Sequence, residues 1–476
     1  MAKIAPFKGI LYNPNKVGDL NKIMAPPYDV ISPAFQDELY KRHPHNIIRL
    51  ILGKTFPDDA ASNDRYSRAA ADFKKWRDED ILVIDKTPAI YYYIQVYKVG
   101  TDLKSVPSGQ PLTNIELVNG QRRARKGFIA LARLEEFGKG GIHPHEKTLA
   151  GPKADRLKLM EACNANFSCI FSLYSEPHKT INRLLEDCCI NGSPIIDVAD
   201  DDGVESKVWR IDRPETIKKV VEAMSDKPLF IADGHHRYET ALNYRNMMRE
   251  QLKDYTGNEL FNYVMMYFSN MDDEGMTIMP THRIIHSITD FKPNTFLANC
   301  SSFFDIEEFK WNGKVEPRVR KEFYKSMEDT GARLPSFGLY INGIDSYFAL
   351  ALKQKDTMDE VFGSSIHDVF KSLDVTVLHA LILNNILGIS SAAQENQTNL
   401  VYIKSMDDAI EETKKHGRQM AFLLNPTKIE QVKAVASSGQ VMPQKSTYFY
   451  PKLLSGMVIN PIGNGEVVCE TVSSNE

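Results

Sequence analysis

A short apolar strand that runs directly into a helix limits the fold of this chain more than any other stretch. Residues 229–231 are apolar and favour a strand, while residues 239–248 are rich in Ala, Leu, Met and Arg and favour a helix. A tight turn and three basic residues connect the two: Asp233, Gly234, His235, His236 and Arg237. Backbone N–H groups and the positive end of the helix dipole point outward at such a start. The turn therefore predicts an anion site, with phosphate the usual anion. A capping role for Asp233, with both histidines in solvent, is the alternative.

Length and composition exclude several classes of protein. A chain of 476 residues predicts two or three domains, and 42% hydrophobic with 25% charged residues is typical of a soluble globular protein. A net charge of -4 argues against bulk nucleic-acid binding. No apolar run approaches a membrane span, and the start of the chain lacks a signal-peptide pattern. The six cysteines show no paired Cys-x-x-Cys spacing, which favours a reducing cytoplasm. The oligomeric state, including a homo-oligomer, stays open.

Alternating strand and helix patterns predict an α/β (α+β) protein with a central mixed sheet. The aromatic, β-branched run 89–97 and the buried-type run 261–268 are typical strands, and 276–285 is expected to be the hairpin partner of the latter. Pro280 should interrupt that partner or place it at an edge. We expect three parts: an N-terminal α/β region (1–87), a central domain (88–289) and a C-terminal α/β region (290–476).

The N-terminal part carries one motif and one charged strand. Two prolines force residues 24–32 into an extended or turn conformation, and Ser32 then caps a helix that starts with a proline. Residues 46–52 are predicted to form a strand. Arg49 within it is expected either to bind an anion or to pair with Asp29.

The loop 140–148, which begins with two glycines, is the second stretch whose side chains could take part in catalysis. It delivers His143, His145, Glu146 and Lys147 within five residues. A carboxylate there can accept a proton from a hydroxyl or orient it, and the flanking His and Lys would keep it ionised. A plain surface pair of Glu146 with Lys147 or Arg156 is the alternative.

Three further features allow two interpretations each. The basic run 122–126 is either a phosphate or nucleic-acid patch or, preferably, a solvated hairpin. His379, on a strongly apolar helix, is more typical of a core or surface residue than of a ligand. The aromatic-rich segment 442–452 either folds back over a site or is an ordinary surface loop.

Four separated motifs together resemble a bacterial and archaeal family catalogued as domain of unknown function 1015. They are Ala25-Pro26-Pro27-Tyr28-Asp29-Val30, His145-Glu146-Lys147-Thr148, Ala232-Asp233-Gly234-His235-His236-Arg237-Tyr238 and Met442-Pro443-Gln444-Lys445-Ser446-Thr447. The family name implies no activity.

The Asp-Gly-His-His-Arg motif is also similar to the phosphate-binding motif of the ParB and sulfiredoxin-like superfamily. Members bind nucleotides there, and some are free-serine kinases in which an upstream His-Glu stretch supplies a catalytic glutamate. This resemblance implies a central ParB/sulfiredoxin-like domain and a small-molecule phosphotransferase, with L-serine as acceptor. It further implies ATP, ADP or pyrophosphate as donor and Mg²⁺ held mostly by the substrate, with one carboxylate such as Asp233.

The residues expected to act fall into three groups. The predicted catalytic residues are Glu146, Asp233 and His236. The predicted phosphate- or nucleotide-binding residues are Gly234, His235, His236, Arg237, Lys147 and Thr148. The predicted substrate-binding residues are Tyr28, Asp29, Arg49, His282, Arg283, Lys445, Ser446 and Thr447.

Two other functions compete with phosphotransfer. A metal-dependent hydrolase would use imidazole and carboxylate ligands of the kind that zinc or manganese prefers: His143, His145, Glu146, His235 and His236. Adjacent residues such as the last two seldom face one ion, which argues against it. A nucleotide- or DNA-binding regulator of ParB-like type has the basic run 122–126 as its only distinct support.

Overall fold

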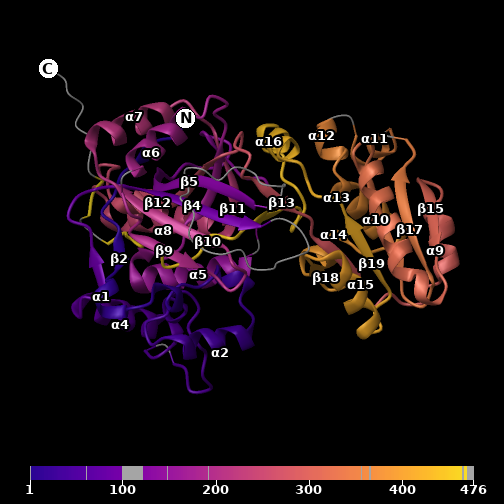
Figure 1. The fold of residues 1–476 in the computed structure, drawn as a ribbon, viewed down its shortest axis with the longest axis horizontal. Helices are drawn as coiled ribbons and strands as arrows, with labels where there is room; N and C mark the ends of the chain where they lie inside the picture. Colours follow the sequence, from indigo (N-terminus) through magenta and orange to yellow (C-terminus); the bar gives the residue numbers. More distant parts are fainter. Residues whose placement is uncertain are drawn as a thin grey trace. The chain divides into compact units, whose positions relative to one another are not determined.

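The computed structural model describes residues 2–60, 62–98, 122–146, 148, 150–190, 192–354, 356–363, 366–463 and 466–468 (Figure 1). The chain forms two compact units. The first unit contains the described residues of Met1–Pro144, Leu149–Thr277 and Pro451–Glu476, and the second unit those of His145–Thr148 and Ile278–Tyr450. The three-part division at residues 87 and 289 stays a prediction about separately folding parts.

A nine-stranded mixed sheet is the centre of the first unit. Its strands run in the order β6-β11-β8-β12-β5-β4-β10-β9, with β1 paired to β5. The pairs β6/β11 and β8/β12 are parallel and the others antiparallel, which confirms the predicted mixed sheet. The strands are β1 (Ile4–Ala5), β4 (Ile90–Lys98), β5 (Arg122–Arg133), β6 (Ile142–His143), β8 (Ile170–Tyr174), β9 (Ile196–Ala199), β10 (Glu205–Ile211), β11 (Leu229–Asp233) and β12 (Tyr263–Asn270).

Helices cover both faces of this sheet, so its inner strands are apolar on both sides. The helices α6 (Thr180–Cys189) and α7 (Pro214–Met224) lie on one face, and α4 (Arg65–Asp78) and α5 (Ala150–Cys163) on the other, where α5 also packs on α8 (His235–Leu252) (Figure 1). Successive residues of a strand face opposite sides of the sheet. The consecutive tyrosines of β4 are all buried, so both faces of the sheet are covered at this strand. The aromatic run 89–97 therefore became an inner strand, as expected.

Short elements complete the first unit, and one of them corrects a prediction. Residues 46–52 do not form a strand; they contain the helical turn α3 (Ile48–Ile51). The Asn46 side chain accepts the N–H of Ile48 at 2.9 Å and donates to Lys22 and Met24 carbonyls, so it starts a turn. Ser32 caps the next helix upstream, α2, as predicted. The remaining elements are α1 (Pro14–Val17), α2 (Pro33–Arg42), β2 (Ile10–Tyr12), β3 (Leu82–Ile84), β7 (Ala165–Asn166), β21 (Asn460–Pro461) and three 3₁₀ turns, η1 (Leu20–Lys22), η2 (Tyr28–Val30) and η4 (Leu260–Asn262).

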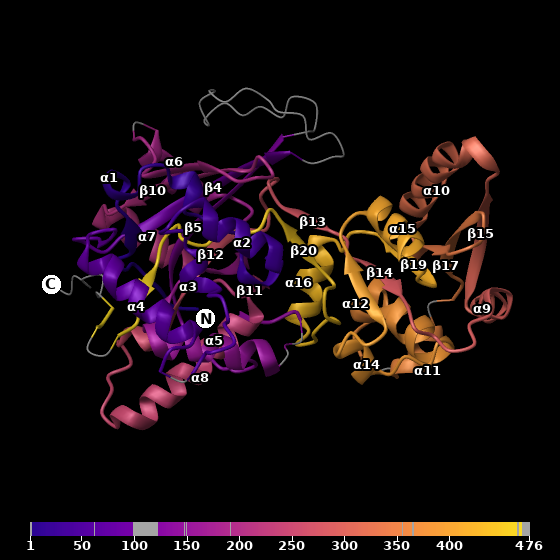
Figure 2. The same cartoon turned by 90° about the horizontal axis from the view of Figure 1, so that it is seen from below.

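The second unit is built on a six-stranded antiparallel sheet in the order β15-β17-β16-β19-β14-β18. Its strands are β14 (His282–Ile285), β15 (Phe304–Lys310), β16 (Ser336–Ile341), β17 (Ser346–Leu352), β18 (Leu400–Ile403) and β19 (Met420–Leu424). Its helices, seen from a second direction in Figure 2, are α9 (Pro293–Cys300), α10 (Glu316–Gly331), α11 (Thr357–Phe362), α12 (Asp368–Lys371), α13 (Asp374–Val377), the π-helix Leu378–Ile386, α14 (Ser391–Glu395), α15 (Met406–Lys415) and α16 (Ile429–Ser437), with a 3₁₀ turn η5 (Gly313–Val315).

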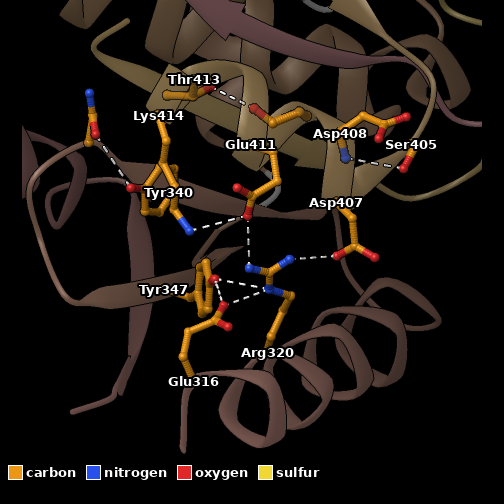
Figure 3. Close-up of polar contacts among 12 residues, drawn as sticks. Glu316, Arg320, Tyr340, Tyr347, Ser405, Asp407, Asp408, Glu411, Thr413 and Lys414 are labelled. Atoms are coloured by element: carbon orange, nitrogen blue, oxygen red, sulfur yellow. Dashed lines mark hydrogen bonds and ion pairs between the residues drawn. The ribbon is translucent and has the colours of Figure 1, made fainter. Parts of the chain in front are cut away.

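Alternating residues of these strands enter two different cores. In β17, Tyr347 and Ala349 face α10 and α15, whereas Phe348 and Leu350 face α9 and the π-helix. Figure 3 shows how α10 is tied to α15: Arg320 pairs with Glu316 at 2.6 Å, with Asp407 at 2.9 Å and with Glu411 at 3.3 Å. The sheet is thus covered on both faces.

The predicted hairpin of 261–268 with 276–285 is wrong. β12 pairs with β5 and β8, while β13 (Thr277–Met279) pairs with β20 (Tyr448–Tyr450), and β14 enters the second sheet. The interruption expected at Pro280 is confirmed, since it lies between β13 and β14. After the turn that follows β12, the chain passes from the first unit into the second. Local sequence could not predict this path, because it depends on strand pairing between distant segments.

Candidate functional site

The predicted strand–turn–helix is present, and one glycine makes the turn. β11 ends at Asp233, α8 begins at His235, and Gly234 between them has a φ of 92°. A Cβ on Gly234 would lie 2.9–3.0 Å from atoms of the Arg237 guanidinium, which folds back over the turn. The positive φ favours glycine here, whereas the close arginine is the end of a flexible side chain that can shift.

Charges are concentrated around this turn. Arg237 Nη1 donates to the carbonyl of Cys169, and its Nη2 lies 3.6 Å from the Asp233 carboxylate. Lys452 Nζ approaches the same carboxylate to 3.3 Å. Asp233 is therefore bracketed by two cations, and Gly234, which has no side chain, occupies the N-cap position of α8. His235 is buried and His236 half-buried.

A small cavity lies against the turn, entirely within the first unit. It measures about 50 Å³, and its polar lining comes from Tyr28, Arg156, Asn166, Ser168, Arg237 and Thr240. This volume suits a small anionic group and not a whole nucleotide. The cavity brings the Pro-Pro-Tyr-Asp motif and the Asp-Gly-His-His-Arg motif to one place, although about 200 residues separate them.

Arg156 is the second cation of the cavity, and sequence reasoning missed its role. It donates to the Ile51 carbonyl at 2.7 Å and pairs with Asp155, and its guanidinium lies 4.0 Å from the centre of the Tyr28 ring. Burial raises the pKa of the Tyr28 hydroxyl, although Arg156 opposes this. Burial also raises the pKa of Asp155, but Arg156, Tyr66 and Arg65 outweigh it and leave the pKa below its usual value. Arg156 is thus fixed by the Ile51 carbonyl of α3 and by Asp155, which Arg65 and Tyr66 of α4 hold in turn.

A second group of motif residues meets inside the second unit. The His145 carbonyl accepts the N–H of Met442 at 2.7 Å, and the Glu146 carboxylate accepts the N–H of Lys445 at 2.8 Å. The buried His145 Nε2 lies 2.9 Å from the hydroxyl of Thr447. Segment 442–447 therefore folds back onto residues 145–146. The roles predicted for Glu146, Lys445, Ser446, Thr447 and Thr148 stay predictions.

Arg283 and His282 of β14 are buried in the same unit. Arg283 donates to the carbonyls of Thr281 and Lys445, the latter at 3.0 Å, and stacks on Tyr402 at 5.3 Å. His282 Nδ1 accepts the N–H of Leu424 at 3.1 Å, and burial lowers the pKa of His282 to about 3. Arg283 thus joins segment 442–447 to β14, whereas His282 bonds to the end of the neighbouring strand β19. A substrate role for either residue stays a prediction.

Other predicted residues have contacts that bear on the alternatives. Arg49 lies over the Tyr40 ring at 4.5 Å and donates to the Tyr40 carbonyl at 3.2 Å, and it forms no ion pair with Asp29, both being described residues. His143 of β6 stacks on Phe230, and burial lowers its pKa. Lys147 lies outside the described residues.

The basic run at the start of β5 lies on a strand that pairs antiparallel with β4, as the hairpin interpretation expected, but its charged side chains are partly or fully buried and not freely solvated. Arg125 is 1% exposed, donates to Gln95 and to the Pro451 carbonyl, and lies over Phe171. Its neighbours are paired as well: Arg122 with Glu205 at 2.5 Å and Lys126 with Glu186 at 2.7 Å. The charges are used within the first unit, which removes the distinct support for a DNA-binding regulator.

The described residues contain no ligand set of the kind that the metal-dependent hydrolase alternative needs. No three His, Cys, Asp or Glu side chains gather there in a way that could hold a metal ion. None of the helices in the described part of the chain has the length and apolar character needed to cross a bilayer.

Comparison with known families matches residues 4–106 and 112–376 to the family described as "Protein of unknown function (DUF1015)". The chain belongs to this family. The match ends before the segment 442–447, whose motif also suggested the family. No curated protein matches the chain.

Several solved structures share a distant likeness with the chain. A conserved hypothetical protein from Pyrococcus furiosus is 14% identical with a TM-score of 0.29, over 66% of this chain and 89% of that one. A free serine kinase in complex with AMP is 12% identical with a TM-score of 0.30, over 65% and 83%. SbnI with a C-terminal truncation from Staphylococcus aureus is 10% identical with a TM-score of 0.33, over 69% and 85%.

Proposed function

We propose that this protein is a small-molecule phosphotransferase that uses ATP, ADP or pyrophosphate as donor, with free L-serine as the leading acceptor. One observation carries the proposal: Arg237 and Arg156 line one cavity beside the first turn of α8. Two guanidinium groups and the N–H groups of a helix start are the donors that a phosphoryl group needs. The similarity of the Asp-Gly-His-His-Arg motif to that of free-serine kinases supports the same reaction.

The turn would bind the phosphates of the donor. Gly234 lets the main chain and the Arg237 guanidinium lie close together, and Arg156 approaches from α5. Both guanidiniums are held by carbonyls, of Cys169 and Ile51, so little reorganisation is needed on binding. The positive charge would stabilise the transferred phosphoryl group.

Magnesium fits this arrangement only as a partner of the donor. Mg²⁺ usually takes one or two carboxylates together with phosphate oxygens and water. Asp233 is the carboxylate at the turn, and Lys452 and Arg237 approach it to 3.3 and 3.6 Å. The ion would neutralise phosphate charge, while Asp233 would help to orient it. Glu146 as proton acceptor for the serine hydroxyl is part of the same proposal.

Phosphate transfer from each donor to L-serine and to a panel of small hydroxyl compounds tests the proposal, with ³¹P NMR to identify products. Arg237→Ala should weaken donor binding by about 1.5–3 kcal/mol, the worth of charge-assisted hydrogen bonds. Arg249→Ala is the matched control, because Arg249 lies on the same helix, hydrogen-bonded to Asn262. Equal donor affinity in the two variants, with both folded, would contradict the phosphate site.

A further inference from the structure

A cavity of about 330 Å³ lies within the second unit, beside the π-helix Leu378–Ile386. Its walls come from α13, the π-helix, α14 and segment 441–444. Pockets for small molecules begin at about 300 Å³ and combine an apolar lining with a few polar groups. The cavity has both the size and this composition.

Two buried polar atoms of residues that line the cavity have no hydrogen-bond partner among the described residues. They are Oγ1 of Thr376, which is 1% exposed, and Nε2 of His379, which is 9% exposed. The two residues are three apart on continuous helix and so lie on the same face. Buried polar atoms in folded proteins nearly always have a partner, so a pair of them lining one cavity points to a ligand.

The hydrogen bonds of Gln394 decide what His379 offers to that ligand. Gln394 Nε2 donates to the Ile389 carbonyl at 2.8 Å and to the His379 carbonyl at 3.5 Å, so its Oε1 faces His379 Nδ1 at 2.8 Å. An amide oxygen only accepts, and therefore Nδ1 carries the hydrogen. Burial, reinforced by Arg283, lowers the pKa of His379 to about 3 and keeps the ring neutral. Nε2 thus presents a lone pair and requires a donor.

The rest of the lining combines apolar side chains with polar ones, among them Asn384, Ser391 and Glu395. Phe362, Phe370, Ala380 and Val441 face the cavity. Pro443 and Gln444 close it from segment 442–447, whose next residue, Lys445, donates its N–H to Glu146. A molecule in the cavity would contact the segment that holds Glu146.

The helix geometry is itself unusual at this place. Leu387 donates to the Ile382 carbonyl at 2.8 Å, a bond across five residues. π-helices are rare and are frequently found at functional sites. Here the π-helix carries His379, Ala380 and Asn384, all of which line the cavity.

We propose that this cavity binds a small uncharged molecule with a hydroxyl at one end and an apolar, ring-sized body at the other. The hydroxyl donates to His379 Nε2 and accepts from Thr376 Oγ1. Its body packs among the two phenylalanines, Ala380 and Val441. The proposal does not depend on the phosphotransfer reaction.

The test compares 4-fluorobenzyl alcohol with 4-fluorotoluene, which has nearly the same shape and no hydroxyl, by ¹⁹F NMR titration of the full chain. The alcohol should bind roughly tenfold more tightly, the worth of one net hydrogen bond or slightly more. Thr376→Val keeps the shape but removes one of the two proposed hydrogen bonds, and should therefore reduce this preference. Absence of alcohol binding, or an alcohol no tighter than the toluene, would overturn the proposal.

A second variant locates the site. Ala380→Leu fills the cavity and should abolish binding of both compounds, while Ala392→Leu adds the same atoms to an exposed position on α14 and should leave binding unchanged. Unchanged alcohol binding by folded Ala380→Leu would place the compound elsewhere and reject the cavity. If that variant does not fold, Thr376→Val decides alone.

Discussion

The turn at Gly234 and the paired segments 145–146 and 442–447 are both assembled from motif residues far apart in the chain, but their side chains are used differently. At the turn, two guanidinium groups line a cavity. In the paired segments, contacts run largely through the main chain: Glu146 accepts from the Lys445 N–H, and Arg283 donates to carbonyls. The first region presents charge to a cavity, whereas the second uses polar groups to hold two segments together.

The largest effect is expected for Glu146→Gln, and it can break this comparison. If Glu146 is the proton acceptor, turnover should fall by roughly 10²–10⁴-fold, because the amide cannot take a proton. The amide oxygen can still accept from Lys445, so the thermal midpoint should change little. Turnover measured beside the thermal midpoint decides. The exposed Glu430→Gln is the control, and near-normal turnover would leave Glu146 as an anchor of segment 442–447.

Two half-buried carboxylates with opposite pKa shifts sharpen the comparison through the pH dependence of stability. Asp155, near the cavity of the first unit, has a lowered pKa, whereas burial raises the pKa of Asp374 in the second unit to about 7 against hydrogen bonds from Asn425 and Ser336. The folded state then binds more protons than the unfolded state between about pH 4 and 7, so Asp374 makes stability fall as pH rises through this window.

Asp374→Asn should therefore be more stable than wild type above pH 7, by up to about 4 kcal/mol, and no more stable near pH 4. Chemical denaturation at pH 4, 5.5, 7 and 8 measures this difference. A difference that does not grow with pH would show that Asp374 titrates normally.

A pair of arginine substitutions tests the comparison directly. Arg237→Ala should weaken donor binding by about 1.5–3 kcal/mol and leave the thermal midpoint nearly unchanged. Arg283→Met should do the reverse, because it leaves buried carbonyls without a donor, with a loss of about 1–3 kcal/mol in stability. Donor titrations and thermal melts on both variants suffice. A loss of donor affinity in folded Arg283→Met would show that the second region also presents charge to the donor.

The smallest effect is expected at the turn itself. Gly234→Ala places a side chain at a φ of 92° and against the Arg237 guanidinium, which should destabilise the protein by about 1–2 kcal/mol. The displaced guanidinium should also weaken donor binding. Gly203→Ala is the control, since Gly203 has a similar positive φ of 74° but open space around it. Equal donor affinity in both variants would show that Gly234 does not contribute to the donor-binding site.

Local chemistry made much of the first unit predictable. The β11–Gly234–α8 turn follows from an apolar run, a glycine that can adopt positive φ and a stretch of strong helix formers. The cap of α2 by Ser32 and the break at Pro280 are equally local. Each depends on residues within one or two turns of each other, so tertiary contacts reinforce them without having to choose them.

Some local predictions failed because a competing local signal was stronger. Residues 47–51 contain three isoleucines and one leucine around Arg49, which favours a strand, but the Asn46 side chain accepts the Ile48 N–H and starts a helical turn. An asparagine before the run was the signal that could have identified it. β propensity is a weak guide unless a partner strand is available.

The sequence by itself determined the mixed α/β class, the family motifs and the glycine turn where phosphate is expected, since these follow from local residue patterns. Only the tertiary structure decided that Arg156 and Tyr28 meet Arg237, that Arg125 is buried instead of exposed, and that β12 pairs with β5 and β8. These outcomes depend on which distant segments pair and on which side chains that pairing buries. Strand pairing is decided by the free energy of the whole assembled core, and it cannot be predicted from a local sequence pattern.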